Sequence, residues 1–426
     1  MPGPDTPTTS VPDPPWWQGG QEAQQRKRKR QQVDKIKDAF KDDQVDVRLY
    51  PNDADPEGME FMYGNLTLLT RTSDADAVLG VLGPQAVAAS DNTLPELTTI
   101  TLSDRAEFAN IREVVARVEA GTQRSPIVGP EHVVHLCGNS GSCPATEPVP
   151  AASETPLPAR SDHPDPGGVG DGVRVVVVDT GCISQVVTKH NWLKGVDGKQ
   201  ERGSVGHYRG HGTFVAGVIR AVAPEATVRI LPLLYRRGAI LEGELVRELV
   251  AALDFQPDII SMSAGTTSFD VGEAVGFQVF FDALKARFPD SVVVTAAGND
   301  NCAEHFWPAS FDWAVGVGAL DSKGLRAGYS NYGDSADVFA LGTDHVNAYP
   351  EPEYHYEEEP MVGQKAKFDN GMAYWSGTSF ATPLVSGLIA AQMTRGPRQT
   401  AKQAWEILYA KAKHNTGLLG RPRLFP

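Results

Sequence analysis

The sequence predicts an α/β fold, with a doubly wound, mostly parallel sheet that is preceded by a small α+β N-terminal domain. First, residues 173–178 form an apolar run interrupted only by Arg174, as expected of a parallel strand covered on both faces. Second, strand-like and helix-like segments alternate after that run, which favours parallel strands joined by right-handed crossovers. Third, residues 144–170 are dense in Pro, Ala, Gly and Asp, which marks a domain boundary.

The composition limits the class of protein and its partners. Its 426 residues suffice for two or three domains and at least one large core. No run of about 18 apolar residues occurs, so we expect no transmembrane helix and no membrane partner. A net charge of −14 argues against a nucleic-acid surface, and no nucleic-acid partner is expected. The first 32 residues lack the apolar segment of a secretory signal, which favours the cytoplasm without fixing the compartment.

The N-terminal part is expected to contain a tail, a small domain and a linker. Residues 1–32 are Pro-rich and then rich in Gln, Lys and Arg, which predicts a disordered tail whose basic run, 26–30, is a solvated arm. Residues 33–137 predict a small α+β domain, and residues 138–170 predict the linker. Strands are predicted at 59–72, 97–102 and 132–136, and helices at 74–82 and 111–118.

The four cysteines do not indicate a zinc site, because they lack paired CxxC spacing. Cys137 and Cys143 lie close together and could be bridged in an oxidising compartment, but free thiols are expected where no export signal is seen. Cys182 and Cys302 each lie three residues after a candidate site residue. They are interpreted as small packing residues, with a thiol-sensitive active site as the alternative.

Residues 171–426 are expected to form the α/β domain. Apolar runs predict strands at 173–178, 227–234, 259–262, 292–295, 314–319 and 338–340. Helical spacing predicts helices at 211–222, 245–253 and 277–288, and the apolar run after Ser379 predicts a buried helix. Residues 351–371 interrupt the pattern with acidic and aromatic side chains, which suits a surface insertion.

Four polar residues lie at the ends of predicted strands or the starts of predicted helices, where functional groups gather in such a sheet. Asp179 ends a strand and His211 opens a helix. Asn299 follows a strand, and Ser379 begins the buried helix. Each residue alone has an ordinary explanation, as a helix cap, a structural histidine or a turn residue. Together they supply every group needed for acyl transfer, which favours catalysis.

In that chemistry Ser379 is the nucleophile, and His211 takes its proton and later delivers it to the leaving amine. Asp179 orients the imidazole and stabilises its charged form. Asn299 and the backbone N–H of Ser379 bind the oxyanion, which the start of a helix also stabilises.

The motifs around these residues resemble those of the subtilisin-like serine proteases, the subtilase family. They are Val178-Asp179-Thr180-Gly181, Gly210-His211-Gly212-Thr213-Phe214-Val215-Ala216-Gly217, Ala297-Gly298-Asn299 and Ser376-Gly377-Thr378-Ser379-Phe380-Ala381-Thr382-Pro383. The resemblance covers roughly residues 173–393, and motifs of this length in this order are highly specific. It implies a serine endopeptidase that acts on polypeptide substrates through an acyl-enzyme and requires no cofactor.

The resemblance also implies a substrate cleft. Ser263-Ala264-Gly265 is similar to the family strand that pairs with an extended substrate and forms one wall of the specificity pocket. Ala296-Ala297-Gly298 is similar to the other wall, and Trp307-Pro308-Ala309 to the segment near the base of the pocket. Phe214 and Phe380 stand where the family usually has His and Met, and neither replacement removes a catalytic group.

Subtilisin-like proteases commonly carry an α+β propeptide, and residues 33–137 are similar to it in the order of their elements. This similarity implies a domain that assists folding, blocks the cleft as an intramolecular inhibitor and is removed by self-processing between residues 136 and 171. A permanent accessory domain that recruits a substrate or partner is the alternative. Structural calcium occurs in the family and stays open here, because no ligand loop is recognisable, and no metal-binding residue is predicted.

Two other classes of function stay open. An inactive protease fold used for binding would be expected to lack a member of the triad, and none is missing. A non-proteolytic acyl transferase, such as a peptide cyclase, would use the same acyl-enzyme with an amine as the acceptor. The acidic residues within 351–359 would favour basic peptides if they border the cleft.

Overall fold

An eight-stranded sheet forms the centre of the larger part of the molecule, in the order β20-β15-β14-β13-β11-β7-β9-β8, and all these pairs are parallel. The structure is a computed structural model that describes residues 21–50, 60–103, 108, 110–136, 147–158, 168–203, 205–268, 274–350, 353–358, 361–416 and 422–425. The strands are β7 (Arg174–Asp179), β8 (Val196–Gly198), β9 (Thr227–Pro232), β11 (Ile259–Met262), β13 (Val292–Ala296), β14 (Ala314–Leu320), β15 (Val338–Leu341) and β20 (Arg423–Leu424).

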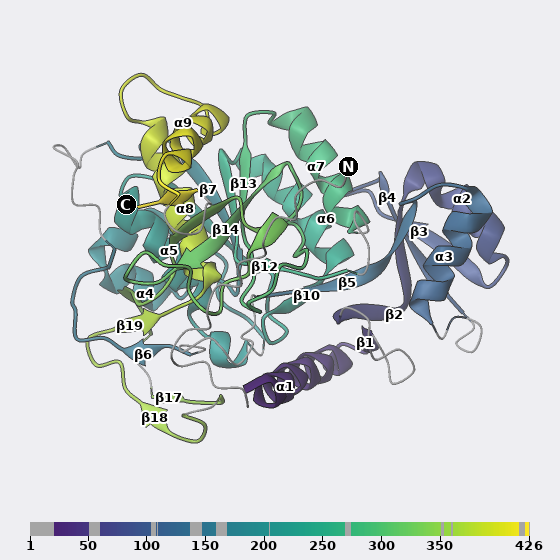
Figure 1. The fold of residues 1–426 in the computed structure, drawn as a ribbon, viewed down its shortest axis with the longest axis horizontal. Helices are drawn as coiled ribbons and strands as arrows, with labels where there is room; N and C mark the ends of the chain where they lie inside the picture. Colours follow the sequence, from purple (N-terminus) through teal and green to yellow (C-terminus); the bar gives the residue numbers. More distant parts are fainter. Residues whose placement is uncertain are drawn as a thin grey trace, which may run out of the picture.

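Both faces of this sheet are apolar, which explains its valine-rich strands. In β7, Val175 and Val177 pack into one cluster and Val176 and Val178 into another, because successive side chains of a strand point to opposite faces. Helices α5, α8 and α9 cover the first face, and α6 and α7 cover the second (Figure 1). They are α5 (His211–Val222), α6 (Glu242–Ala252), α7 (Val275–Arg287), α8 (Thr378–Met393) and α9 (Ala401–Lys413). The predicted doubly wound α/β fold is confirmed.

The predicted strands and helices of this sheet are all present, with small differences at their ends. The predicted strand 227–234 ends at Pro232, because the N–H groups of Leu233 and Leu234 turn to the carbonyl oxygen of Asp179, at 3.0 and 3.1 Å. The shorter elements that surround the sheet are α4 (Ser184–Lys189), β16 (His345–Ala348), β17 (Tyr354–His355), β18 (Lys365–Ala366) and β19 (Met372–Trp375).

A second, antiparallel sheet belongs to the N-terminal unit, which we define as the elements from α1 to β5. Its strands follow the order β10-β5-β2-β4-β3, with β1 on β2 and β12 on β5. Two strands of the larger part, β10 and β12, therefore complete the sheet of the N-terminal unit (Figure 1). The elements are β1 (Val47–Tyr50), β2 (Phe61–Arg71), α2 (Ala75–Leu82), β3 (Ala86–Ser90), β4 (Leu97–Leu102), α3 (Ile111–Thr122), β5 (Val128–Leu136), β10 (Ala239–Leu241) and β12 (Ala264–Gly265).

Helix α1 (Gln21–Asp42) corrects the expectation of a disordered tail up to residue 32, because residues 21–32 are the first half of this helix. Residues 1–20 lie outside the described residues. Val33, Ile36 and Phe40 form one buried helix face against β1, β2, β5 and β10. This apolar stripe begins only at residue 33, so the polar first half gave no helical signal. Among the described residues, no helix is both long enough and apolar enough to cross a membrane.

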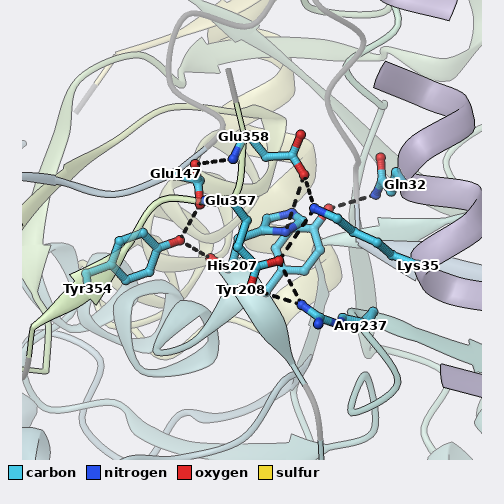
Figure 2. A network of polar contacts seen from close by, with 9 residues as sticks. All are labelled: Gln32, Lys35, Glu147, His207, Tyr208, Arg237, Tyr354, Glu357 and Glu358. Carbon is cyan, nitrogen blue, oxygen red and sulfur yellow. Dashed lines mark hydrogen bonds and ion pairs between the residues drawn. The ribbon is translucent and has the colours of Figure 1, made fainter. Parts of the chain in front are cut away.

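The expected linker is also partly packed. Within residues 138–170, β6 (Val149–Pro150) pairs with β19, and Glu147 is buried. Its carboxylate accepts hydrogen bonds from the hydroxyl of Tyr354 at 2.8 Å and from the N–H groups of Glu357 and Glu358 at 2.8 and 3.0 Å (Figure 2). These contacts attach the segment after the N-terminal unit to the 351–371 insertion.

The insertion is less of a surface loop than its composition suggested. Tyr354, Tyr356 and Phe368 are buried, and the rings of Tyr354 and Tyr356 lie 5.1 Å apart in an edge-on arrangement. Their apolar area outweighs the acidic side chains between them in the sequence, so the insertion folds onto the core of the larger part.

Candidate active site

Asp179 and His211 are brought into contact by the elements that carry them. Asp179 is the last residue of β7 and His211 is the first residue of α5, and both side chains are buried. The Nδ1 atom of the imidazole lies 2.8 and 2.9 Å from the two carboxylate oxygens. A carboxylate at this distance favours the tautomer with the proton on Nδ1, which leaves Nε2 able to accept a proton.

Glu201 supports this pair, and sequence reasoning missed it. One carboxylate oxygen accepts hydrogen bonds from the Thr180 hydroxyl at 3.0 Å and the Gly210 N–H at 2.8 Å. It therefore ties the turn after Asp179 to the turn before His211. Burial raises the pKa of the Glu201 carboxyl above its ordinary value. A single glutamate in a loop has no spacing or motif that would have revealed this role.

Ser379 lies at the buried start of α8, where two local features set its position. Gly377, which precedes the helix, has φ 155°, a conformation that favours glycine. Pro383 has no N–H group, so the carbonyl oxygen of Ser379, four residues earlier, receives no helical hydrogen bond from it. The hydroxyl of Ser263 donates to that oxygen instead, at 3.0 Å. The start of α8 is thereby tied to the segment that follows β11.

Asn299 follows β13 and lies beside the start of α8. Its Oδ1 accepts hydrogen bonds from the N–H and the hydroxyl of Thr378, at 3.0 and 2.8 Å. Since the oxygen end of the amide is engaged by the protein, the NH₂ end is the one that can donate to a ligand. That nitrogen lies next to the backbone of Gly377, 3.4 Å from where a Cβ on this residue would stand.

The start of α8 lies beside the imidazole of His211, but in the described structure no direct hydrogen bond joins the Ser379 hydroxyl to that ring. The ring of Phe380, the residue after Ser379, lies 5.2 Å from the imidazole between centroids. The Ser379 hydroxyl donates instead to the carbonyl oxygen of Ser263, at 3.5 Å. Hydrogen bonds between catalytic groups are often long before a substrate binds and shorten in the complex.

Aromatic rings enclose the imidazole of His211. Trp375 meets it edge-on at 5.1 Å and Tyr208 at 6.1 Å, and Phe214 packs on Phe380 at 4.9 Å. The phenylalanines at the two positions where a histidine and a methionine were expected thus belong to one apolar enclosure. Because these rings exclude water, they strengthen the electrostatic interaction between the imidazole and its carboxylate partner.

The two expected walls of a substrate pocket lie next to Ser379. β11 pairs with β13, so the segments that follow these strands leave the sheet as neighbours. The first segment holds Ser263, Ala264 and Gly265. The second wall holds Ala296, which ends β13, and then Ala297 and Gly298, and all six residues are buried. The expected base segment is also adjacent, because Trp307 pairs with Thr266 through two backbone hydrogen bonds of 2.7 and 2.8 Å.

Strand β5 of the N-terminal unit lies along the first of these segments. It pairs antiparallel with β10 on one side and with β12 on the other, where His135 is opposite Gly265 and Leu136 is opposite Ala264. The N–H of Leu136 also donates to the carbonyl oxygen of Gly238, at 2.8 Å. Main-chain pairing along a strand edge is a common way for a protein to hold an extended peptide.

The cysteines that the structure describes fit packing roles. Cys182 is buried in the core, and burial raises the pKa of its thiol to about 11, so the thiol stays protonated at neutral pH. Cys302 is half-buried, and both residues are free thiols. Cys137 and Cys143 lie outside the described residues. Among those that are described, no group of three or more His, Cys, Asp or Glu is placed to hold a metal ion.

The chain is similar to known proteins both in sequence and in fold. The sequence model of the subtilase family matches residues 170–424. An intracellular serine protease of Paenibacillus polymyxa is 29% identical in an alignment 243 positions long, which covers 52% of this chain and 66% of the relative. A thermostable alkaline protease of Halalkalibacterium halodurans is 30% identical in an alignment 272 positions long, which covers 61% of this chain and 66% of the relative.

Among solved structures, fervidolysin from Fervidobacterium pennivorans, a keratinolytic enzyme related to subtilisin, matches with a TM-score of 0.56 and 20% identity. The match covers 84% of this chain and 58% of fervidolysin. At this identity the likeness shows the fold alone. The chain spans 53 to 66% of the length of three curated relatives, which include the two proteases described above.

Proposed function

This chain belongs to the subtilase family, and on that premise we propose that it is a serine endopeptidase that hydrolyses polypeptides through an acyl-enzyme. The observation that carries the proposal is the contact of both Asp179 carboxylate oxygens with Nδ1 of His211, next to the start of the helix that bears Ser379. A buried imidazole oriented in this way is a general base for a neighbouring hydroxyl.

In the proposed reaction, Oγ of Ser379 attacks the carbonyl carbon of the scissile bond while its proton moves to Nε2 of His211. The carbon–nitrogen bond then breaks, and Nε2 delivers the proton to the leaving amine. Water repeats both steps on the acyl-enzyme, which releases the acid and restores Ser379. Asp179 stabilises the imidazolium that forms in each step.

The negative charge on the substrate oxygen is stabilised by two donors in this proposal. One is the NH₂ group of Asn299, and the other is the backbone N–H of Ser379, which belongs to the first turn of α8. The bonds from Thr378 to Asn299 hold the amide in place before the substrate arrives, so little reorganisation is needed during the reaction.

We further propose that the N-terminal unit is an intramolecular inhibitor that the enzyme removes itself. β5 lies between β10 and β12, where an extended substrate would pair. Continuing this register by one residue beyond Leu136 reaches Ser263, whose carbonyl oxygen is 3.5 Å from Oγ of Ser379. The bond expected to be cut is therefore the one between Cys137 and Gly138.

The central experiment compares the wild-type chain with Ser379→Ala by intact-mass analysis, N-terminal sequencing and peptide hydrolysis. Wild-type protein is expected to react with a fluorophosphonate probe, to hydrolyse peptides and to yield a fragment that ends at Cys137. Ser379→Ala is expected to stay full length, to lack both activities and to keep the melting temperature of the uncut chain, because Oγ makes only one long hydrogen bond.

Three outcomes would contradict the proposal. Hydrolysis that survives in Ser379→Ala would reject this nucleophile. Ring-closed or ligated products as the main outcome would indicate an acyl transferase. Wild-type protein that stays full length while fully active would show that the N-terminal unit is a permanent accessory domain.

A further inference from the structure

We propose that Phe306 closes the pocket beside Ser379 and restricts cleavage to bonds that follow a small residue, such as Gly, Ala, Ser or Cys. The inference rests on the proposed function, because it names the substrates of the same site. It follows from the place of one aromatic ring relative to the two walls of the cleft, residues 263–265 and 296–298.

The Phe306 ring lies against the first wall. A Cβ placed on Gly265 would lie 2.4 and 2.8 Å from two carbons of this ring, closer than carbon atoms can approach. The Phe306 side chain is buried, and its backbone N–H is 3.0 Å from the hydroxyl oxygens of both Ser310 and Ser335. The backbone of this residue is therefore fixed where its ring meets the wall.

The same ring reaches the second wall. It packs on Ala296, and its Cγ would lie 3.4 Å from a Cβ on Gly298. The side-chain amide of Asn331 fills the space next to it, since its nitrogen donates to the carbonyl oxygen of Ala297 at 2.9 Å. The space between the walls, which a large substrate side chain would need, is thus occupied by protein atoms.

β5 indicates which residue of a bound peptide faces this ring. The imidazole of His135 meets the Phe306 ring edge-on at 6.3 Å, and alternate residues of a strand share a face. His135 is opposite Gly265, so the residue two positions later in a bound peptide shares its face and lies beside Ser263. That residue immediately precedes the bond that Ser379 would attack, and its side chain is directed to the space that Phe306 occupies.

The sequence after β5 fits the same rule. The two residues that flank the bond proposed for self-processing, Cys137 and Gly138, are both small, and residues 139–142 are Asn, Ser, Gly and Ser. A substrate with Phe, Tyr or Leu at the corresponding position would have to displace the Phe306 ring from a packed site, which opposes binding in the transition state.

The first test uses the wild-type enzyme and a pair of fluorogenic peptides that differ only in the residue before the scissile bond, Ala or Phe. We expect kcat/KM for the Ala peptide to exceed that for the Phe peptide by about 100-fold. Mass spectrometry of the fragments of unfolded casein is expected to place the cuts after small residues. An equal or higher kcat/KM for the Phe peptide would overturn the inference.

The second test opens the pocket with Phe306→Ala. This change is expected to raise kcat/KM for the Phe peptide by about 100-fold and to change that for the Ala peptide by less than about fivefold. The control is Phe281→Ala, which removes a half-buried ring of α7 that stacks on Trp313, and it should leave the ratio unchanged. Phe306→Leu, which removes less volume, is expected to shift the ratio in the same direction by less, and it replaces the Ala variant if that one unfolds.

Labelling with a fluorophosphonate separates this inference from the proposed function. A labelled Phe306 variant whose ratio equals that of the wild type would overturn the inference alone, as would labelled wild-type protein that cuts after Phe or Leu. Protein that is neither labelled nor able to cut any peptide would overturn the proposed function, and the inference with it.

Discussion

The two ends of the Asn299 side-chain amide face different parts of the proposed site. The oxygen end accepts two hydrogen bonds from Thr378 and so helps to fix the start of α8. The nitrogen end lies by the backbone of Gly377, on the side of the helix start where charge would develop. Because Thr378 at the start of α8 holds the Asn299 amide by two hydrogen bonds, the position of the amide is fixed relative to that helix.

This arrangement predicts the effect of Asn299→Ala. The turnover number kcat should fall by about 10²–10³-fold with little change in KM, since the lost hydrogen bond is made mainly to the oxyanion. Steady-state kinetics with one peptide substrate checks the result, and a melting curve shows that the start of α8 persists. Asn415→Ala, an exposed change beyond α9, is the control. A rise in KM with kcat unchanged would argue against oxyanion stabilisation.

Residues differ in how far the sequence revealed them. Asp179, His211 and Ser379 belong to local motifs at strand ends and helix starts, so their places follow from the order of elements. Glu201 and Phe306 carry no such signal. The contacts of Glu201 come from two turns that meet only in the folded chain. The role proposed for Phe306 comes from glycines on two distant segments.

At the scale of elements, the acidic segment 353–358 joins parts of the molecule that are distant in the sequence. Lys35 of α1 contacts Glu358 at 2.6 Å and Glu357 at 3.4 Å, and Arg237 contacts Glu357 at 2.8 Å (Figure 2). On the other side, the backbone of the same segment donates to Glu147. The acidic side chains thus pair with Lys35, which precedes the bond proposed for self-processing, and with Arg237, which follows it.

These contacts predict that the double change Glu357→Gln and Glu358→Gln weakens the hold on α1. Half-buried ion pairs contribute about 0.5–1 kcal/mol each, so loss of the cluster should speed release of the cleaved N-terminal unit about 5- to 30-fold. Size-exclusion chromatography after processing, or the rate at which peptide hydrolysis appears, measures the release. Glu353→Gln is the matched control, because Glu353 pairs with Lys365 within its own hairpin. Equal release in both variants would reject this role for the segment.

Helices and strands whose apolar residues recur at a regular spacing were predictable from the sequence. Those that depend on contacts with distant segments were not. The valine run of β7 and the apolar stripes of α6 and α7 gave the parallel sheet. The first half of α1 and the two-residue strands β6 and β12 show no regular spacing of apolar residues in the sequence. They exist because a neighbour supplies the packing or the hydrogen bonds, which is information that the local sequence does not contain.

At the scale of the whole molecule, buried carboxylates lie where the N-terminal unit meets the larger part. Glu131 of β5 is next to the N–H of Gly243 at the start of α6, with Arg247, Glu242 and Glu244 as the charged neighbours. Burial raises the pKa of the Glu131 carboxyl to about 7. The adjacent His132 lies 2.8 Å from Glu242. Between about pH 4.5 and pH 7, Glu131 is therefore protonated while the N-terminal unit is attached and ionised once the unit has separated.

This difference predicts that attachment of the N-terminal unit depends on pH. The stabilisation is fully present below about pH 4.5 and is lost as the pH rises through about 7, with a total of about 3 kcal/mol for the 2.5-unit difference. The affinity between the processed fragments, measured from pH 5 to pH 8, should therefore fall with rising pH. Glu131→Gln should flatten this dependence, and Glu96→Gln, an exposed change in the same unit, should not. An unaltered slope in Glu131→Gln would assign the effect to other groups.

The position of β5 between β10 and β12 fixes the width of the opening that its departure would leave. Neighbouring strands are spaced about 4.8 Å apart, so the gap admits a single extended backbone and no helix or paired hairpin. A folded protein substrate would have to unfold a segment of its chain before that segment could bind between the two strands. The rate at which such a folded substrate is digested would then depend on how often it unfolds locally, and not on how often it collides with the enzyme.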